Sequence, residues 1–161
     1  MDNLNLPKAE LKVTTKAGKP HVFDVLRRKY VALTPEEWVR QQFVHFLIGQ
    51  KGYPAECIGN EVSINLNGTR KRCDTVVYGC NAQPTMIVEY KSPRVEISQQ
   101  VFEQVSRYNI KLRVKWLIVS NGLQHYCCRI DYESGTYQFL EDIPSYDDIK
   151  GSSGNPSQSI S

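Results

Sequence analysis

The sequence predicts an α/β domain in which helices pack on a mixed β-sheet. Segments with helical and with strand periodicity alternate along the chain. The most apolar stretches, 85–90 and 114–119, have the continuous hydrophobic character of central strands covered on both faces. With 161 residues, we expect one domain over 1–150. Residues 151–161 are rich in Ser, Gly, Asn, Pro and Gln, which predicts a disordered polar tail.

The first part of the chain predicts a hairpin followed by a helix. Strands are expected at 10–14 and 21–26, with Gly18 and Pro20 in the turn between them. Thr34-Pro35-Glu36-Glu37 is a strong helix start: Thr34 can be the N-cap, Pro35 takes the first helical position, and Glu37 completes a capping box. The helix presents an apolar face and ends within 49–54; that face comprises Val39, Phe43, Phe46 and Leu47.

The second part predicts three strands, a helix and further strands. Residues 61–66 alternate polar and apolar, and Asn67-Gly68 turns them into a strand at 70–78. The next strand is 85–90, and Ser98 can then cap a second helix. A central strand follows at 114–119, and Asn121-Gly122 is expected to turn it into 125–130, with a last strand at 137–140. One face of the second helix is expected to comprise Val101, Val105, Tyr108 and Leu112.

Composition and charge are those of an ordinary globular protein. The net charge of +3 and pI of about 8.6 permit nucleic-acid binding without arguing for it. Basic clusters occur at 27–29, at 70–72 and from 107 to 115, and solvated surface is the plain alternative for each. The five cysteines form no C-x-x-C pair, so we expect free thiols in a reducing cytoplasm. No apolar segment predicts secretion or membrane spanning, and no G-x-x-x-x-G-K-[ST] motif predicts a P-loop motor.

Two acids and a lysine carry the strongest chemical signal. Asp74 interrupts a strand-like run, and Glu89 ends the most apolar strand, with Lys91 two residues on and therefore on the same face. Each has a structural alternative: a strand-end Asp paired with Arg70 or Arg72, and an ion pair between Glu89 and Lys91. A divalent metal shared by the two carboxylates would equally offset the cost of removing them from water. Hard oxygen ligands favour Mg²⁺ or Mn²⁺ over zinc.

Residues on the two helices could complete such a site. The capping box explains Glu37, yet the first turn of a helix can also direct a carboxylate towards a metal at a sheet edge. Arg40 can contact a phosphate or pair with Glu36 or Glu37. Gln104 and Tyr108 lie one turn apart, and the Gln104 amide could hold a water, a carboxylate or a phosphate.

In this order the residues resemble the PD-(D/E)XK nuclease superfamily, in which Q-x-x-x-Y is typical of the RecB-like branch. Residues 26–41, Arg72-Cys73-Asp74-Thr75-Val76-Val77-Tyr78, Val88-Glu89-Tyr90-Lys91-Ser92-Pro93 and Ser120-Asn121-Gly122 are similar to the N-terminal nuclease domain of type I restriction enzyme R (HsdR) subunits. The similarity covers about 25–130. Cys73 stands where Pro is common, and the translocase of a full R subunit is not expected in this chain.

The resemblance implies a restriction-endonuclease-like αβββαβ core, a mixed sheet flanked by helices, to which this chain adds its N-terminal hairpin. It further implies that Asp74 and Glu89 bind Mg²⁺, for which Mn²⁺ can substitute, with the Tyr90 carbonyl as another ligand. Lys91 would be the catalytic lysine. Glu37 would be the acid of the first helix, and Gln104 and Tyr108 the Q-x-x-x-Y pair.

The leading hypothesis is a Mg²⁺-dependent DNA endonuclease domain that uses a metal-activated water. Phosphate contacts are expected from basic residues: Arg40, Arg70, Arg72, Arg94 and Arg107. DNA is the expected partner. Separate motor or specificity subunits, and a dimer, are compatible with the sequence. The alternatives are a catalytically inactive DNA-binding or assembly module on the same fold, and a structural domain in which Asp74 and Glu89 lie far apart.

Overall fold

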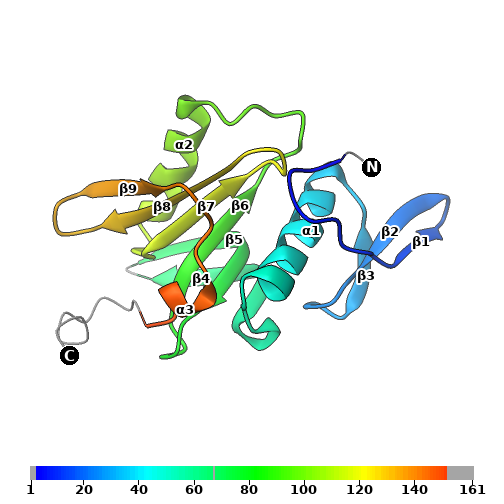
Figure 1. The fold of residues 1–161 in the computed structure, drawn as a ribbon, viewed down its shortest axis with the longest axis horizontal. Coiled ribbons are helices and arrows are strands. Elements are labelled where there is room, and N and C mark those ends of the chain that lie inside the picture. The colour runs from blue at the N-terminus through cyan, green and yellow to red at the C-terminus, as the bar shows by residue number, and fades with distance from the viewer. Residues whose placement is uncertain (1–2, 67, 152–161) are drawn as a thin grey trace.

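The computed structural model describes residues 3–66 and 68–151, and it contains a six-stranded mixed sheet, a three-stranded antiparallel sheet and α-helices packed on them (Figure 1). The elements in chain order are β1 (Val13–Lys16), β2 (Lys19–Asp24), β3 (Lys29–Ala32), α1 (Pro35–Gln50), a short 3₁₀ helix (Ala55–Cys57), β4 (Ile58–Leu66), β5 (Thr69–Tyr78), β6 (Pro84–Tyr90), α2 (Gln99–Ile110), β7 (Trp116–Ser120), β8 (His125–Asp131), β9 (Thr136–Leu140) and α3 (Tyr146–Ile149).

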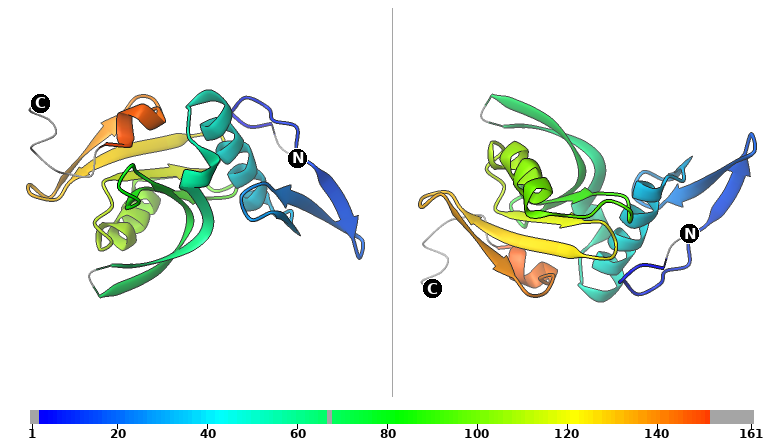
Figure 2. Two further views of the ribbon diagram at one scale, coloured as in Figure 1. Left: turned by 90° about the horizontal axis from the view of Figure 1, so that it is seen from below. Right: turned by 90° about the horizontal axis from the view of Figure 1, so that it is seen from above.

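The larger sheet has the strand order β4-β5-β6-β7-β8-β9. All neighbours are antiparallel except β6 and β7, which are parallel and are joined through α2. The order α1, β4, β5, β6, α2, β7 confirms the predicted αβββαβ core. Helices α1 and α3 cover one face of the sheet and α2 covers the other, and the β4–β5 hairpin curves around α2 (Figure 2).

Each face of the sheet has its own hydrophobic core. Val88 and Ile118 point towards α1, where Phe43 and Leu47 pack against them. Ile87, one residue from Val88, points to the opposite face and packs with the residues around α2. Burial on both faces explains why β6 and β7 read as continuous apolar runs.

The N-terminal segment forms a three-stranded sheet, so the predicted hairpin was incomplete. Strands β1 and β2 pair through a turn in which Ala17 and Gly18 both have positive φ, as a two-residue hairpin requires. Strand β3 then pairs with β2 and was missed in the sequence because it is short and begins at the end of a basic run. Helix α1 lies between the two sheets (Figures 1 and 2).

Helix α1 begins as the sequence predicts, with one exception. The Thr34 hydroxyl accepts a hydrogen bond from the Glu37 amide, and Pro35 is the first helical residue. Val39, Phe43 and Leu47 are fully buried on the predicted face. The Glu37 carboxylate does not complete a capping box; it turns to arginine side chains, and the Thr34 amide donates to the Ala32 carbonyl.

The predicted face of α2 is confirmed in part: Val101 and Val105 pack against the core, and Leu112 is fully buried. Ser98 caps the helix as expected, but the buried positions are Phe102, Ser106 and Asn109. Tyr108 is 60% exposed, and Leu112 lies beyond the end of the helix. Two of the three buried positions are polar, which hides this face from a search for apolar periodicity.

The remaining strands match the expected order, and α3, which the sequence did not predict, packs on the α1 side of the sheet. Among the residues that the structure describes, no helix combines the length and apolar character needed to cross a membrane. The predicted tail lies outside the described residues except for Gly151, and so does Asn67 of the β4–β5 turn, although its flanking residues pair as expected.

Candidate active site

Asp74 and Glu89 lie opposite each other on β5 and β6. The pairing of these strands ends at Thr75 and Val88, and one further step in the same register brings Asp74 across from Glu89. At that step the Asp74 carboxylate accepts a hydrogen bond of 2.9 Å from the Tyr90 amide. Directly opposed residues have Cβ atoms about 5 Å apart on one face of a sheet. The two carboxyl groups therefore meet where the strands separate.

The environment of Glu89 disfavours its charged form. Its exposed fraction is 9%. Burial raises the pKa of Glu89 to about 7, and the charge of Asp74 and a hydrogen bond between the two carboxyl groups act in the same direction. The Lys71 ammonium, 2.5 Å from Glu89 Oε1, acts against this increase. Two carboxyl groups this close favour a proton or a cation between them.

This oxygen-rich pair fits a small divalent cation. Mg²⁺ is commonly held by one or two carboxylates, with waters at its remaining positions. Among the described residues, no group of three or more His, Cys, Asp or Glu side chains is placed to hold a metal ion. A cation held by this pair would have Asp74 and Glu89 as its side-chain ligands, and the Tyr90 main chain lies directly beside them.

Lys91 directly follows the strand that carries Glu89, and the Q-x-x-x-Y residues lie on α2. The Lys91 amide donates to the Ser120 carbonyl of β7 at 2.8 Å. Gln104 and Tyr108 are on the exposed side of α2. Within residues 3–66 and 68–151, no hydrogen bond joins either of them to Asp74 or Glu89, and their catalytic assignment stays a prediction.

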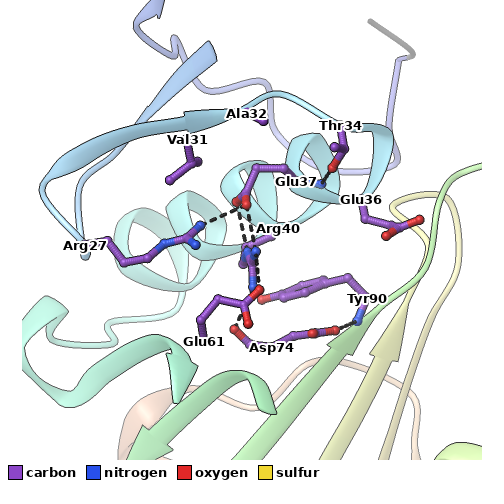
Figure 3. A pocket seen from close by; sticks show the side chains of 10 residues that line it. All are labelled: Arg27, Val31, Ala32, Thr34, Glu36, Glu37, Arg40, Glu61, Asp74 and Tyr90. Carbon is purple, nitrogen blue, oxygen red and sulfur yellow. Dashed lines mark hydrogen bonds and ion pairs between the residues drawn. The ribbon is translucent and has the colours of Figure 1, made fainter. Parts of the chain in front are cut away.

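Glu37 is the acceptor of a buried hydrogen-bond cluster (Figure 3). Its carboxylate accepts from Arg27 Nη2 at 2.8 Å, from Arg40 Nε at 2.9 Å and Nη2 at 2.7 Å, and from Gln41 Nε2 at 3.0 Å. Burial alone would raise the pKa of Glu37, but the hydrogen bonds and the charge of Arg40 hold it below its ordinary value. The carboxylate is therefore ionised, and its lone pairs are directed at these donors.

Arg40 connects this cluster to the carboxyl pair. The guanidinium donates to the Asp74 main-chain carbonyl at 2.9 Å and to Glu61 at 3.0 Å, in addition to Glu37. The side chain is buried, and its donors point at protein acceptors (Figure 3). The predicted phosphate contact would require these bonds to break, so the geometry of Arg40 suits a structural link between α1 and β5.

A second buried chain of hydrogen bonds runs from the N-terminal sheet to Tyr90. Asp24 of β2 accepts from Asn60 at 2.9 Å, Asn60 accepts from Thr75 at 2.7 Å, and Thr75 accepts from the Tyr90 hydroxyl at 2.9 Å. Asp24 also pairs with Arg27. Polar contacts thus join the small sheet to β4, β5 and β6 of the large sheet.

An open cavity of about 350 Å³ lies beside Asp74, between β3, the start of α1 and the strands β4, β5 and β6 (Figure 3). Charges of both signs line it. The lining residues are Arg27, Val31, Ala32, Thr34, Glu36, Glu37, Arg40, Glu61, Asp74 and Tyr90.

The other basic residues expected to contact DNA are exposed. Arg70, Arg94 and Arg107 have exposed side chains. Arg72 is also exposed and pairs with Glu61 at 2.8 Å. These four side chains are accessible to a phosphate backbone, whereas Arg40 is not.

Two residues near the site were missed in the sequence. Glu61 is the register neighbour of Asp74 on β4 and has a positive φ of 56°, which is uncommon for a residue other than Gly. The sequence placed Lys71 in the basic cluster 70–72 and indicated no acidic partner for it. The period-two pattern could have aligned Glu61 with Asp74 across the Asn67-Gly68 turn, whereas the Lys71–Glu89 pair depends on how β5 curves.

Known proteins resemble this chain in sequence and in fold. Residues 35–144 match the family of the type I restriction enzyme R protein N terminus. No curated protein sequence matches the chain. A solved fragment described as an HsdR subunit of a type I restriction enzyme from Vibrio vulnificus YJ016 has the same fold, with a TM-score of 0.52 and 21% sequence identity. The similarity covers 73% of this chain and 24% of that fragment. Because the family match spans more than half of the sequence, the chain belongs to the type I restriction enzyme R protein N-terminal family.

Proposed function

We propose that this domain hydrolyses phosphodiester bonds in DNA with the help of Mg²⁺ held by Asp74 and Glu89. One observation carries the proposal: Asp74 and Glu89 lie opposite each other on neighbouring strands, and Glu89 is almost fully buried. Two acids in contact are unfavourable unless a proton or a cation lies between them. Membership of the R protein N-terminal family supports a nuclease function of this kind.

Each residue of the site has a distinct task in the proposed reaction. The Tyr90 amide fixes the Asp74 carboxylate, and the register of β5 and β6 fixes Glu89 beside it. Lys91, two residues after Glu89, would orient the attacking water and stabilise charge on the phosphate in the transition state. A bound Mg²⁺ would lower the pKa of water and polarise the phosphate. The reaction needs no covalent nucleophile.

We further propose that DNA translocation and sequence recognition come from other polypeptides or other parts of a larger assembly. The chain spans about a quarter of the solved HsdR fragment that it matches. The exposed arginines of this domain suit phosphate contacts, which bind DNA without reading its sequence. On this proposal the domain cuts DNA that a partner delivers.

The test is cleavage of plasmid DNA in Mg²⁺ or Mn²⁺ by the wild type and by the variants Asp74→Ala and Lys91→Ala. Cleavage by the wild type and its loss in both variants are expected. Glu36→Gln is the matched control, because Glu36 is an exposed acid at the rim of the same cavity. If the wild type cuts no better than the two variants, the proposal is wrong.

A second candidate is a DNA-binding module without catalysis. It is favoured by the contacts of Glu37 and Glu89, both of which already pair with cationic side chains of the protein. On this reading the wild type would retard duplex DNA in a gel without cutting it, and Mn²⁺ would not bind at Asp74 and Glu89.

A further inference from the structure

Lys71 forms the ion pair that neutralises Glu89. Its Nζ lies 2.5 Å from Glu89 Oε1, and the side chains are 22% and 11% exposed. Lys91, the lysine that the sequence couples to Glu89, does not make this contact in the described part of the chain. The residue that faces the buried acid therefore comes from β5, three positions before Asp74.

The location of Lys71 gives it access to solvent as well as to Glu89. Its neighbours Arg70 and Arg72 are exposed on the outer part of the β4–β5 hairpin. This hairpin extends beyond the end of β6 and curves around α2 (Figure 2). A lysine side chain is long and flexible, so its ammonium can leave Glu89 and reach a phosphate beside the basic run without movement of the main chain.

A divalent cation and the Lys71 ammonium are both attracted to the Glu89 carboxylate. A cation ligated by Glu89 would lie close to the Lys71 ammonium, and the repulsion between the two positive charges would weaken the Lys71–Glu89 ion pair. The ammonium released in this way needs another anion. A phosphate of bound DNA would provide it, so cation binding and DNA binding would assist each other.

We propose that Lys71 is a displaceable counterion: it holds Glu89 when no divalent cation is bound, and it moves to a DNA phosphate when the cation binds. Lys71 thus acts as a positioning residue that makes cation binding depend on DNA. This inference rests on the proposed function, because it takes Asp74 and Glu89 to be the cation ligands.

The test is the affinity for Mn²⁺, measured by calorimetry at about pH 8 so that catalysis does not enter the measurement. In Lys71→Met no ammonium has to be displaced, and we expect Mn²⁺ to bind about tenfold more tightly than in the wild type. Lys19→Met is the matched control: it makes the same substitution at an exposed lysine at the start of β2, in the small sheet. We expect it to change the affinity less than about twofold.

A second arm repeats the titration with a short phosphorothioate duplex, which resists cleavage. The duplex should tighten Mn²⁺ binding in the wild type and in Lys19→Met, and do so much less in Lys71→Met. Equal or weaker Mn²⁺ binding by Lys71→Met, or the same effect of the duplex in all three proteins, would overturn the inference. Lys71→Gln repeats the test with a polar side chain, and thermal melting shows that each variant is folded.

Glu89→Gln separates failure of this inference from failure of the proposed function. If Mn²⁺ binds the wild type but not Glu89→Gln, and Lys71→Met has no effect, only the role of Lys71 is wrong. If the wild type shows no Mn²⁺ binding that depends on Glu89, both proposals are wrong.

Discussion

The Asp74 carboxylate accepts a hydrogen bond of 2.9 Å from the Tyr90 amide at the point where β5 and β6 stop pairing. A side-chain oxygen thus takes the place of a main-chain partner, and this orients the acid. The main-chain carbonyl of Asp74 is held in turn by Arg40. Asp74 is therefore held by β6 through its side chain and by α1 through its main chain. A catalytic or binding site needs side chains that are held rigidly in this way.

This arrangement separates the structural and chemical roles of Asp74. Asp74→Asn keeps an oxygen that can accept from the Tyr90 amide, so we expect little change in the free energy of unfolding. Asp74→Ala leaves that amide without its partner and should cost about 1–3 kcal/mol. Both variants should lose Mn²⁺ binding. Urea unfolding and calorimetry measure the two effects, and Mn²⁺ binding retained by Asp74→Asn would contradict the assignment.

The raised pKa of Glu89 predicts a pH-dependent gain in stability for Glu89→Gln. The pKa of Glu89 is about 7 in the folded protein and near 4.5 in the unfolded chain, so the folded state binds more protons between these values. The wild type therefore loses stability as the pH rises from about 4.5 to about 7. Glu89→Gln should be more stable than the wild type at about pH 8, by on the order of 1–3 kcal/mol.

Thermal unfolding of both proteins at about pH 8 and about pH 5 checks this prediction. The difference should be small at the lower pH, where Glu89 of the wild type is protonated. A stabilisation of equal size at both values would show that the charge of Glu89 is not its cause.

Loss of the Arg40 guanidinium should destabilise the protein strongly. Arg40→Met leaves Glu37 buried without its principal partner, and we expect a cost of about 3 kcal/mol or more near pH 7. The lowered pKa of Glu37 means that its contribution is complete above about 4.5, its unfolded value, and is lost as the pH falls through the folded value. The cost of Arg40→Met should therefore shrink in acid.

Arg72→Met is the matched control for this variant. Arg72 pairs with the same Glu61 as Arg40, but its side chain is 69% exposed, so the expected cost is under about 1 kcal/mol. Urea unfolding of both variants at several pH values distinguishes them. Equal costs would show that the buried cluster does not stabilise the fold.

The exposed arginines should contribute to DNA binding through phosphate contacts. If Arg107 contacts one phosphate, Arg107→Gln should reduce the slope of log affinity against log salt by about 0.9. Lys19→Gln provides the control, because β2 begins at Lys19, and the small sheet that contains β2 lies across α1 from the large sheet (Figure 1). Fluorescence anisotropy over a range of salt concentrations measures both slopes, and an unchanged slope for Arg107→Gln would remove that residue from the DNA-binding surface.

Local signals were sufficient for most of the fold. The Thr34-Pro35 helix start, the Ser98 cap and the alternation along β4 depend on neighbours within one turn or one strand, and the structure has each of them as predicted. The continuous apolar character of β6 and β7 likewise reflects burial on both faces. The meeting of Asp74 and Glu89 follows from the register of two adjacent strands.

The parts that could not be predicted depend on contacts between distant segments. Lys71 reaches Glu89 because the β4–β5 hairpin curves, and no local pattern encodes that curvature. The buried face of α2 includes Ser106 and Asn109, so apolar periodicity displaced the predicted face and included the exposed Tyr108. Glu37 has a sufficient local explanation as a capping residue, yet Arg27, from the turn after β2, draws its carboxylate into a tertiary cluster.

Anomalous diffraction from a crystal of the wild type soaked in Mn²⁺ tests directly whether Asp74 and Glu89 hold a cation. We expect a peak between the Asp74 and Glu89 carboxylates, at about 2.1 Å from an oxygen of each, with the Lys71 ammonium displaced from Glu89. A soaked crystal with no peak there, and with the Lys71–Glu89 ion pair intact, would contradict this assignment.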